Sequence, residues 1–209
     1  FKDDENSFAN KHPDLRDMSK QFSLATPYGT SAFRQAQATG KSTAECQMLI
    51  DRYFSAHPSV ELMMLESHEQ AKANGVVHSL YGRPRRIPEA KEINEVYGKD
   101  TSHAELPYAA RTLLNLGMNH RVQSSAASIM NRAAIAVYNS CKSLEAEDSS
   151  WNQVKIVLQV HDEVILEGPE ELSEQMCLIL KTCMEKTTTL PGVDLIADPK
   201  VAKNLADLK

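Results

Sequence analysis

The stretch that decides the fold is Gln159-Val160-His161-Asp162-Glu163, which lies between Lys155-Ile156-Val157-Leu158 and Val164-Ile165-Leu166. Two short apolar runs around a polar tip are typical of a β-hairpin, because the apolar residues form the strands and the polar residues form the turn. Such a hairpin would hold its two carboxylates clear of the sheet. Carboxylate oxygens are ligands that hard divalent cations prefer, so the pentad predicts a cation site.

The composition narrows the class of protein. With 209 residues, the chain is long enough for one large domain or two small ones. Its net charge of −5 argues against indiscriminate binding to nucleic acid but is compatible with a local basic groove. No apolar run approaches the roughly 20 residues of a membrane span, and no secretory signal is visible. The four scattered cysteines have no CxxC pair, which indicates reduced thiols in a cytosolic protein.

Apolar periodicity predicts mostly helices. The first expected helix covers residues 14–25, with Asp14 as N-cap, and is broken by Pro27 and Gly29. A second helix is expected to start at Ser42 or Thr43 and to reach residue 56, and a third to cover 60–73 with Ser59 as its N-cap. Two more helices are expected over 108–143, with an interruption near 117–121, and over 169–187. Besides the hairpin, strands are expected over 76–82, ending in a basic tip at Arg83, Arg85 and Arg86, and near 193–196.

A second cluster of polar residues lies far upstream of the pentad. Arg16, Lys20, Leu24 and Tyr28 are spaced four residues apart, so they follow one side of a helix with a drift of roughly 40° per step. Arg16 and Lys20 lie in the N-terminal half, where backbone N–H groups also favour anions. Two cations there suit the β- and γ-phosphates of a nucleoside triphosphate. The alternative is a solvated helix face without a ligand.

Four segments together resemble motifs of the DNA polymerase I (family A) enzymes. Arg16-x-x-x-Lys20 with Tyr28-Gly29 resembles their motif B, and the pentad 159–163 resembles their motif C. The segment 80–88, Leu-Tyr-Gly-Arg-Pro-Arg-Arg-Ile-Pro, is similar to the family's Leu-Phe-Gly-Arg-Arg-Arg segment. Asn119-x-x-x-Gln123-x-x-Ala-Ala resembles a helix of the family. The four motifs stand in the family's order and cover roughly residues 14–209.

The resemblance implies an α+β fold, with mostly helical fingers in residues 1–92 and the C-terminal part of a palm, with an antiparallel sheet, in 93–209. It implies a DNA-directed DNA polymerase that adds dNTPs to a primer 3′ end. Asp162 would be one of two carboxylates that bind paired Mg²⁺ ions, and Glu163 would be a weaker outer partner or a tip charge without ligation. Lys20 and Arg16 would neutralise the triphosphate, and Lys20 would also be a candidate proton donor to pyrophosphate.

The same resemblance assigns contacts with DNA. Tyr28 would stand where the templating base enters. In the minor groove at the primer end, every correct base pair offers the same acceptors, purine N3 and pyrimidine O2. The residues that would donate hydrogen bonds to these acceptors are Asn119, Gln123 and His161. The DNA phosphate backbone would be contacted by Arg83, Arg85 and Arg86, which alternatively only solvate a turn.

Two positions depart from the family pattern within motif B. Leu24 stands where the family usually has Phe or Tyr packed against the incoming sugar, which predicts discrimination against dideoxynucleotides. A leucine here is similar to viral, particularly phage, members, and would imply the cytoplasm of a bacterium or a phage-infected host. Pro27 removes a helical N–H before Tyr28, so the helix is expected to kink or end one turn early.

The largest departure is motif A, which carries the family's other metal-binding aspartate. Nothing in residues 1–13 resembles it, since Asp3-Asp4-Glu5 lacks an apolar strand. The chain begins with Phe1, which indicates processing, trimming or a cut from a longer chain. The expectation is a chain that is inactive alone and works with a second polypeptide carrying motif A and the thumb. A catalytically dead remnant that binds nucleotide or DNA is the alternative, as is a fragment of a single-subunit RNA polymerase.

Overall fold

The computed structural model describes residues 7–208, without the side chains of Phe8 and Ala9. It has an α+β fold of helices with two small antiparallel sheets, as expected. The chain divides into two compact units, Phe1–Val122 and Gln123–Lys209. The assignment of 1–92 to fingers and 93–209 to a palm stays a prediction, and Asp3-Asp4-Glu5 lies outside the described residues.

Helix α2 (Pro13–Ala25) follows the short α1 (Phe8–Lys11) and ends where the sequence predicts. Pro27 cannot donate a helical N–H, and the chain tightens into the 3₁₀ turn η1 (Thr26–Tyr28). Thr26 is buried and donates from its Oγ1 to the carbonyl of Phe22 at 2.8 Å. The helix therefore ends one turn before Tyr28.

Helices α3 (Ala32–Thr39) and α4 (Thr43–Ala56) complete this part of the first unit. The expected start of α4 is confirmed, because Ser42 and Glu45 form a reciprocal capping box. Helix α3 was not predicted, although Ser31 caps its start by accepting from the N–H of Arg34. Eight residues are too few to give a clear 3.6-residue periodicity. A small core shared by α3 and α4 contains Ala32, Cys46 and Ile50.

Helix α5 (Pro58–Asn74) begins after His57, so the prediction of Ser59 as its N-cap was wrong by two residues. Pro58 explains the shift, because its fixed φ suits the first helical position. Strands β1 (Val76–His78) and β2 (Pro84–Arg86) then pair antiparallel, with Val76 opposite Arg86. The expected strand over 76–82 is therefore shorter. The chain already reverses at residues 79–83, where the N–H of Ser79 bonds the carbonyl of Arg83 at 3.0 Å.

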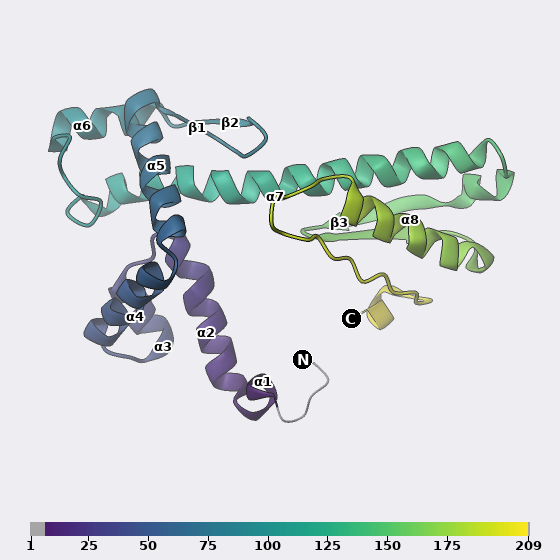
Figure 1. Cartoon of the computed structure of the whole chain (residues 1–209), viewed down its shortest axis with the longest axis horizontal. Coiled ribbons are helices and arrows are strands. Elements are labelled where there is room, and N and C mark those ends of the chain that lie inside the picture. The colour runs from purple at the N-terminus through teal and green to yellow at the C-terminus, as the bar shows by residue number, and fades with distance from the viewer. Residues whose placement is uncertain (1–6, 209) are drawn as a thin grey trace. The chain divides into compact units, whose positions relative to one another are not determined.

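The core of the first unit forms around the N-terminal half of α7 (Tyr108–Glu145), after η2 (Pro88–Lys91) and α6 (Glu92–Tyr97). The predicted interruption near 117–121 was wrong, since α7 is continuous over 38 residues (Figure 1). Gly117 is tolerated because a Cβ there would lie 2.9 Å from Cγ2 of Val77. The glycine permits close packing of α7 on β1, and this packing stabilises the helix.

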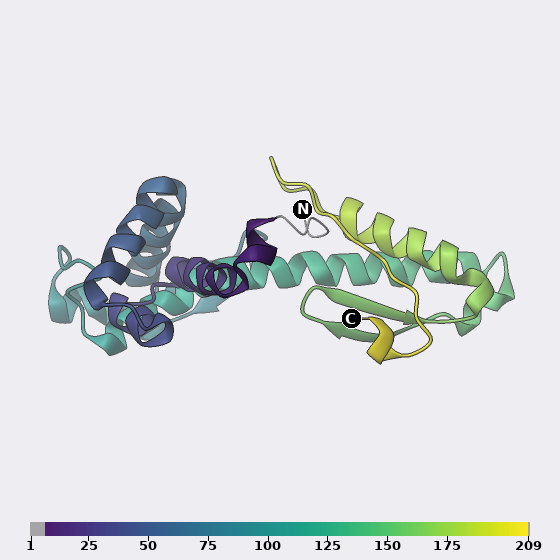
Figure 2. The same cartoon turned by 90° about the horizontal axis from the view of Figure 1, so that it is seen from below.

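In the second unit, the predicted hairpin is confirmed as β3 (Lys155–Val160) and β4 (Glu163–Glu167). The short turn η3 (Ser149–Gln153) precedes it, and η4 (Glu170–Leu172) leads into α8 (Ser173–Lys186). Figures 1 and 2 show the hairpin and α8 beside the C-terminal half of α7. Their shared core contains Val137, Trp151, Val154 and Met176. On β3, by contrast, Val157, Leu158 and Val160 are exposed.

The predicted strand near 193–196 was wrong. Only an isolated bridge between Leu190 and Val193 forms there, and η5 (Leu205–Leu208) follows. Two side chains of α8 bind the backbone of Ala197 instead: Lys181 donates to its carbonyl at 3.0 Å, and Glu185 accepts from its N–H at 3.0 Å. These bonds attach the chain to α8 one residue after the expected strand.

Neither a disulfide nor a membrane-spanning helix is found in the described part of the chain. All four cysteines are free thiols, and three of them, Cys46, Cys141 and Cys183, are buried. Between residues 7 and 208, no helix is both long and apolar enough to cross a membrane.

Candidate functional site

The turn of the β3–β4 hairpin consists of His161 and Asp162. Val160 pairs with Glu163, so these two residues alone connect the strands. His161 has φ +51°, in the left-handed region that few residues other than glycine adopt. Such backbone outliers cluster at functional sites, and the turn leaves the side chains of His161, Asp162 and Glu163 exposed. The hairpin thus presents a histidine and two carboxylates together.

The carboxylates of Asp162 and Glu163 fit part of a magnesium site. Among residues 7–208, no group of three or more His, Cys, Asp or Glu side chains is placed to hold a metal ion. Mg²⁺ usually keeps several waters and takes one or two protein carboxylates together with substrate phosphates. The donor chemistry at the turn therefore suits Mg²⁺ as an incomplete ligand set.

The base of the turn is tied to α7. Nε2 of Gln159, at the end of β3, donates to Oδ1 of Asn131 on α7 at 3.5 Å. The apolar core beneath, with Val137 fully buried, fixes the hairpin on the helix. The turn is accordingly supported by a packed scaffold, which is what a positioned ligand group requires.

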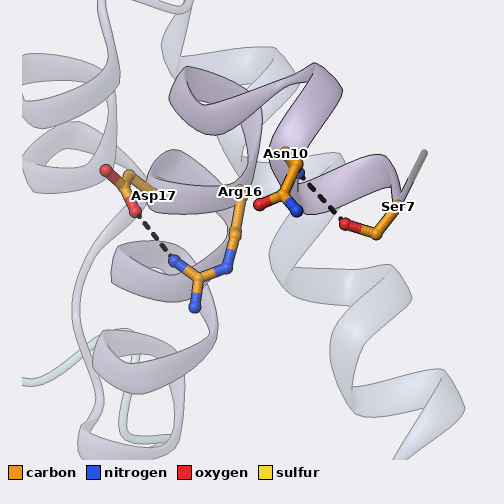
Figure 3. A network of polar contacts seen from close by, with 4 residues as sticks. All are labelled: Ser7, Asn10, Arg16 and Asp17. Carbon is orange, nitrogen blue, oxygen red and sulfur yellow. Dashed lines mark hydrogen bonds and ion pairs between the residues drawn. The ribbon is translucent and has the colours of Figure 1, made fainter. Parts of the chain in front are cut away.

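Helix α2 presents the predicted nucleotide-binding residues to solvent. Arg16, Lys20 and Leu24 are all exposed, and Leu24 is 58% exposed. Nη1 of Arg16 lies 3.5 Å from Oδ1 of Asp17 (Figure 3), an exposed pair of small energetic value. A phosphate that approached Arg16 would therefore displace a weak partner only.

Tyr28 lies at the end of η1, half-buried, and Gly29 follows it in the left-handed conformation with φ +74°. Asn115 of α7 packs directly on this glycine, because a Cβ on Gly29 would lie 2.5 Å from Asn115 Oδ1. Nδ2 of Asn115 also donates to the carbonyl of Gly29 at 3.4 Å. The structure thus adds Asn115, which sequence reasoning missed although it precedes Asn119 and Gln123 at the same four-residue spacing.

A buried polar cluster lies on the other side of Asn115. The rings of His68 on α5 and His103 stack with centroids 4.6 Å apart. Burial, then the neighbouring His103, lowers the pKa of His68 to about 3, and burial likewise lowers the pKa of His103. Asn115 lies near enough to raise both pKa values against this effect, yet its Oδ1 makes no hydrogen bond of standard geometry with a described residue. Both histidines are therefore neutral at pH 7.

The remaining predicted DNA contacts are exposed. Asn119 and Gln123 lie on α7, one turn apart, and Arg83, Arg85 and Arg86 lie on the hairpin β1–β2 or its turn. His120 of α7 bonds the carbonyl of Arg83 through Nε2 at 2.9 Å, which fixes this basic hairpin on the helix.

The candidate residues are divided between the two units. Arg16, Lys20, Leu24, Tyr28, Asn119 and the three arginines belong to the first unit, whereas Gln123, His161, Asp162 and Glu163 belong to the second. A helix with exposed cations and a hairpin with exposed carboxylates are the charge types that nucleotide and metal chemistry uses. The fold defines the class as an α+β protein of helices with two small antiparallel sheets.

Comparison with known proteins gives the family. The family model for DNA polymerase family A matches residues 5–207. The chain therefore belongs to DNA polymerase family A. DNA polymerase I of Pseudomonas aeruginosa is 35% identical over 191 residues, which is 91% of this chain and 19% of that protein. DNA polymerase I of Bacillus caldotenax is 32% identical over 178 residues, 85% of this chain and 18% of that protein.

A solved structure extends the similarity to three dimensions. The POL domain of Pol1 from M. smegmatis, in complex with DNA primer-template and dNTP, matches with a TM-score of 0.72 and 27% identity. The match covers 88% of this chain and 29% of that chain. The chain thus spans about a fifth of the length of the two curated relatives.

Proposed function

We propose that this chain supplies the fingers and the C-terminal part of the palm to a template-directed DNA polymerase that extends a primer 3′ end with dNTPs. The observation that carries the proposal is the two-residue turn His161-Asp162, which exposes a carboxylate pair on a packed hairpin. Membership of DNA polymerase family A favours this enzyme over the single-subunit RNA polymerases.

The nucleotide would be bound by the exposed face of α2. Arg16 and Lys20 neutralise the triphosphate, and Lys20 is the candidate donor of a proton to the leaving pyrophosphate. Leu24, one turn further, packs against the sugar of the incoming nucleotide. Tyr28 stands at the entry of the templating base. Movement of this helix onto a correct nucleotide would contribute to selection as well as to rate.

Mg²⁺ would be held by Asp162, with Glu163 as an outer partner. When bound, the paired ions lower the pKa of the primer 3′-hydroxyl and stabilise the charge on the leaving group. Asp162 would hold the cation through its carboxylate, and the pairing of Val160 with Glu163 on either side of the turn would support that carboxylate. Glu163, at the start of β4, adds negative charge next to it.

DNA would be contacted by exposed polar and basic residues. Asn119, Gln123 and His161 donate hydrogen bonds to minor-groove acceptors of the primer-terminal base pair. Because these acceptors are shared by all correct pairs, such donors do not distinguish the four bases. Arg83, Arg85 and Arg86 contact the phosphate backbone, where guanidinium groups bind through paired N–H donors.

A second metal-binding carboxylate is required for this chemistry. We propose that it comes from outside these residues, as motif A, either on a second polypeptide together with the thumb or on a longer form of the same chain. Arg16, Lys20, Gln123, His161 and Asp162 occur together, and a catalytically dead remnant has no reason to keep all five.

Primer extension with Mg²⁺ tests the proposal. The chain is assayed alone and together with the polypeptide that supplies motif A, and Asp162→Ala is expected to abolish extension by the complete polymerase. Asp148→Ala is the matched control, because Asp148 is exposed in the second unit and lies outside the site. Extension by Asp162→Ala at the wild-type rate would refute the proposed role. Extension by the 209-residue chain alone would refute the need for another carboxylate.

A further inference from the structure

The close contact between Gly29 and Asn115 joins two segments that are 86 residues apart in the sequence. The N–H of Gly29 bonds the carbonyl of Thr26 at 3.0 Å, which closes the η1 turn, and the carbonyl of Gly29 accepts from Nδ2 of Asn115 at 3.4 Å. Gly29 has no side chain that would keep Asn115 away, since a Cβ would overlap its Oδ1 at 2.5 Å. The amide of Asn115 therefore lies against the backbone that follows Tyr28.

Asn115 is itself held in place by its surroundings. It lies on α7 one residue after the buried Leu114, and its Oδ1 is enclosed. The stacked rings of His68 and His103 lie beside it, and His68 is only 2% exposed. A side chain fixed on one side by a packed helix and buried rings can fix the backbone on its other side.

We propose that Asn115 is a positioning residue for Tyr28: through its contact with Gly29 it sets the η1 turn against α7. This inference rests on the proposed function, which places Tyr28 at the entry of the templating base. Pro27 has already ended α2, so Tyr28 lies in the 3₁₀ turn η1 and not in the α-helix. The Asn115 contact joins the end of this turn to α7.

Loss of the contact should affect nucleotide selection more than DNA binding. With the turn loosened, Tyr28 occupies its position for a smaller fraction of the time, and the templating base is less well ordered. A hydrogen bond of this kind contributes about two- to tenfold in an equilibrium. We expect the KM for the correct dNTP to rise by about that factor, together with the frequency of misincorporation, while affinity for primer-template is unchanged.

Two substitutions separate positioning from general stability. Asn115→Leu removes the donor to Gly29 and all polar contact with the histidines. Asn115→Asp has the same shape and can accept N–H groups from His68 and His103, but it cannot donate to the carbonyl of Gly29. If Asn115 positions the turn, both variants raise the KM, because neither can donate a hydrogen bond to the carbonyl of Gly29.

The test uses the complete polymerase, with single-nucleotide incorporation as the readout. Ile93→Val is the matched control, because Ile93 is buried in the same core but lies on α6, and it should leave the KM unchanged. The inference would be overturned if both Asn115 variants had the KM and the misincorporation frequency of the wild type. It would also be overturned if Ile93→Val raised the KM as much as the Asn115 variants do. Asp162→Ala is assayed in parallel. If Asp162→Ala stays active, both the proposed function and this inference are overturned. If Asp162→Ala is inactive while the Asn115 variants behave as the wild type, only the inference is overturned.

Discussion

The imidazole rings of His68 and His103 lie face to face, with their planes only 17° from parallel. Two protonated rings in this arrangement would repel each other inside the fold, and Lys72 adds a further positive charge that disfavours protonation of both. The fold therefore favours the neutral form of both rings.

This pair predicts a loss of stability in acid. The pKa of His68 is about 3 in the folded chain against 6.5 as its usual value, so the unfolded chain binds more protons between these values. The contribution is complete above pH 6.5 and is lost as the pH falls towards 3, with about 2 kcal/mol lost by pH 5 from His68 alone. Thermal unfolding from pH 8 to pH 5 measures it.

His68→Gln is the variant that isolates the effect. Glutamine does not titrate, so the slope of stability against pH between 6.5 and 5 should flatten, whatever the variant does to stability at pH 8. His57→Gln, at an exposed position, should keep the slope of the wild type. An unchanged slope in His68→Gln would contradict the prediction.

Gly29→Ala should destabilise the chain more than Gly40→Ala. Both glycines have nearly the same positive φ, +74° and +71°, so both alanines pay the same backbone cost of about 1–2 kcal/mol. Only Gly29 also has Asn115 within overlap distance, whereas nothing lies within 4 Å of a Cβ on Gly40. Urea unfolding of the two variants gives the difference, which is the cost of displacing Asn115. Equal costs would mean that Asn115 moves aside freely.

His161→Gly should separate the structural and functional roles of the hairpin turn. Glycine adopts φ +51° without penalty, so the variant should be as stable as the wild type or more stable by about 1 kcal/mol. Its primer-extension rate should nevertheless fall, because the imidazole that we propose as a contact of the primer terminus is missing. His161→Ala should lose the rate and some stability as well. A fully active His161→Gly enzyme would remove His161 from the DNA contacts.

Leu24→Tyr should make the polymerase accept dideoxynucleotides. Leucine lacks the hydroxyl that can substitute for a missing 3′-hydroxyl, and its exposed position on α2 accommodates a larger side chain. Competition between ddNTP and dNTP in single-nucleotide incorporation measures the ratio, with Leu24→Phe as the matched variant that lacks the hydroxyl. Equal incorporation of both nucleotides by the wild type would contradict the expected discrimination.

The elements that the sequence predicted correctly are those determined by neighbouring residues, without contacts from distant parts of the chain. The capping box of Ser42 and Glu45 and the two apolar runs on either side of the polar tip at 159–163 each determine structure over a few residues. The end of α2 was equally predictable, because Pro27 acts on its own neighbourhood.

The failures arose where distant residues decide. Gly117 suggested a break in α7, yet Val77 packs into the space that the missing side chain leaves. Residues 193–196 are apolar enough for a strand, but a strand also needs a neighbouring strand, and only an isolated bridge between Leu190 and Val193 forms there. The contact of Asn115 with Gly29 spans 86 residues, a distance over which spacing patterns carry no information.

The exposed apolar side chains of β3 have a practical consequence. The side chains of Val157, Leu158 and Val160 are 48%, 41% and 42% exposed. They lie on a sheet that, among the described residues, has only the two strands β3 and β4, so the outer edge of each strand pairs with no further strand. Open edges with apolar side chains promote association between copies. Purified at high concentration, the 209-residue chain should tend to aggregate, and a charged residue in place of Val157 should improve its solubility.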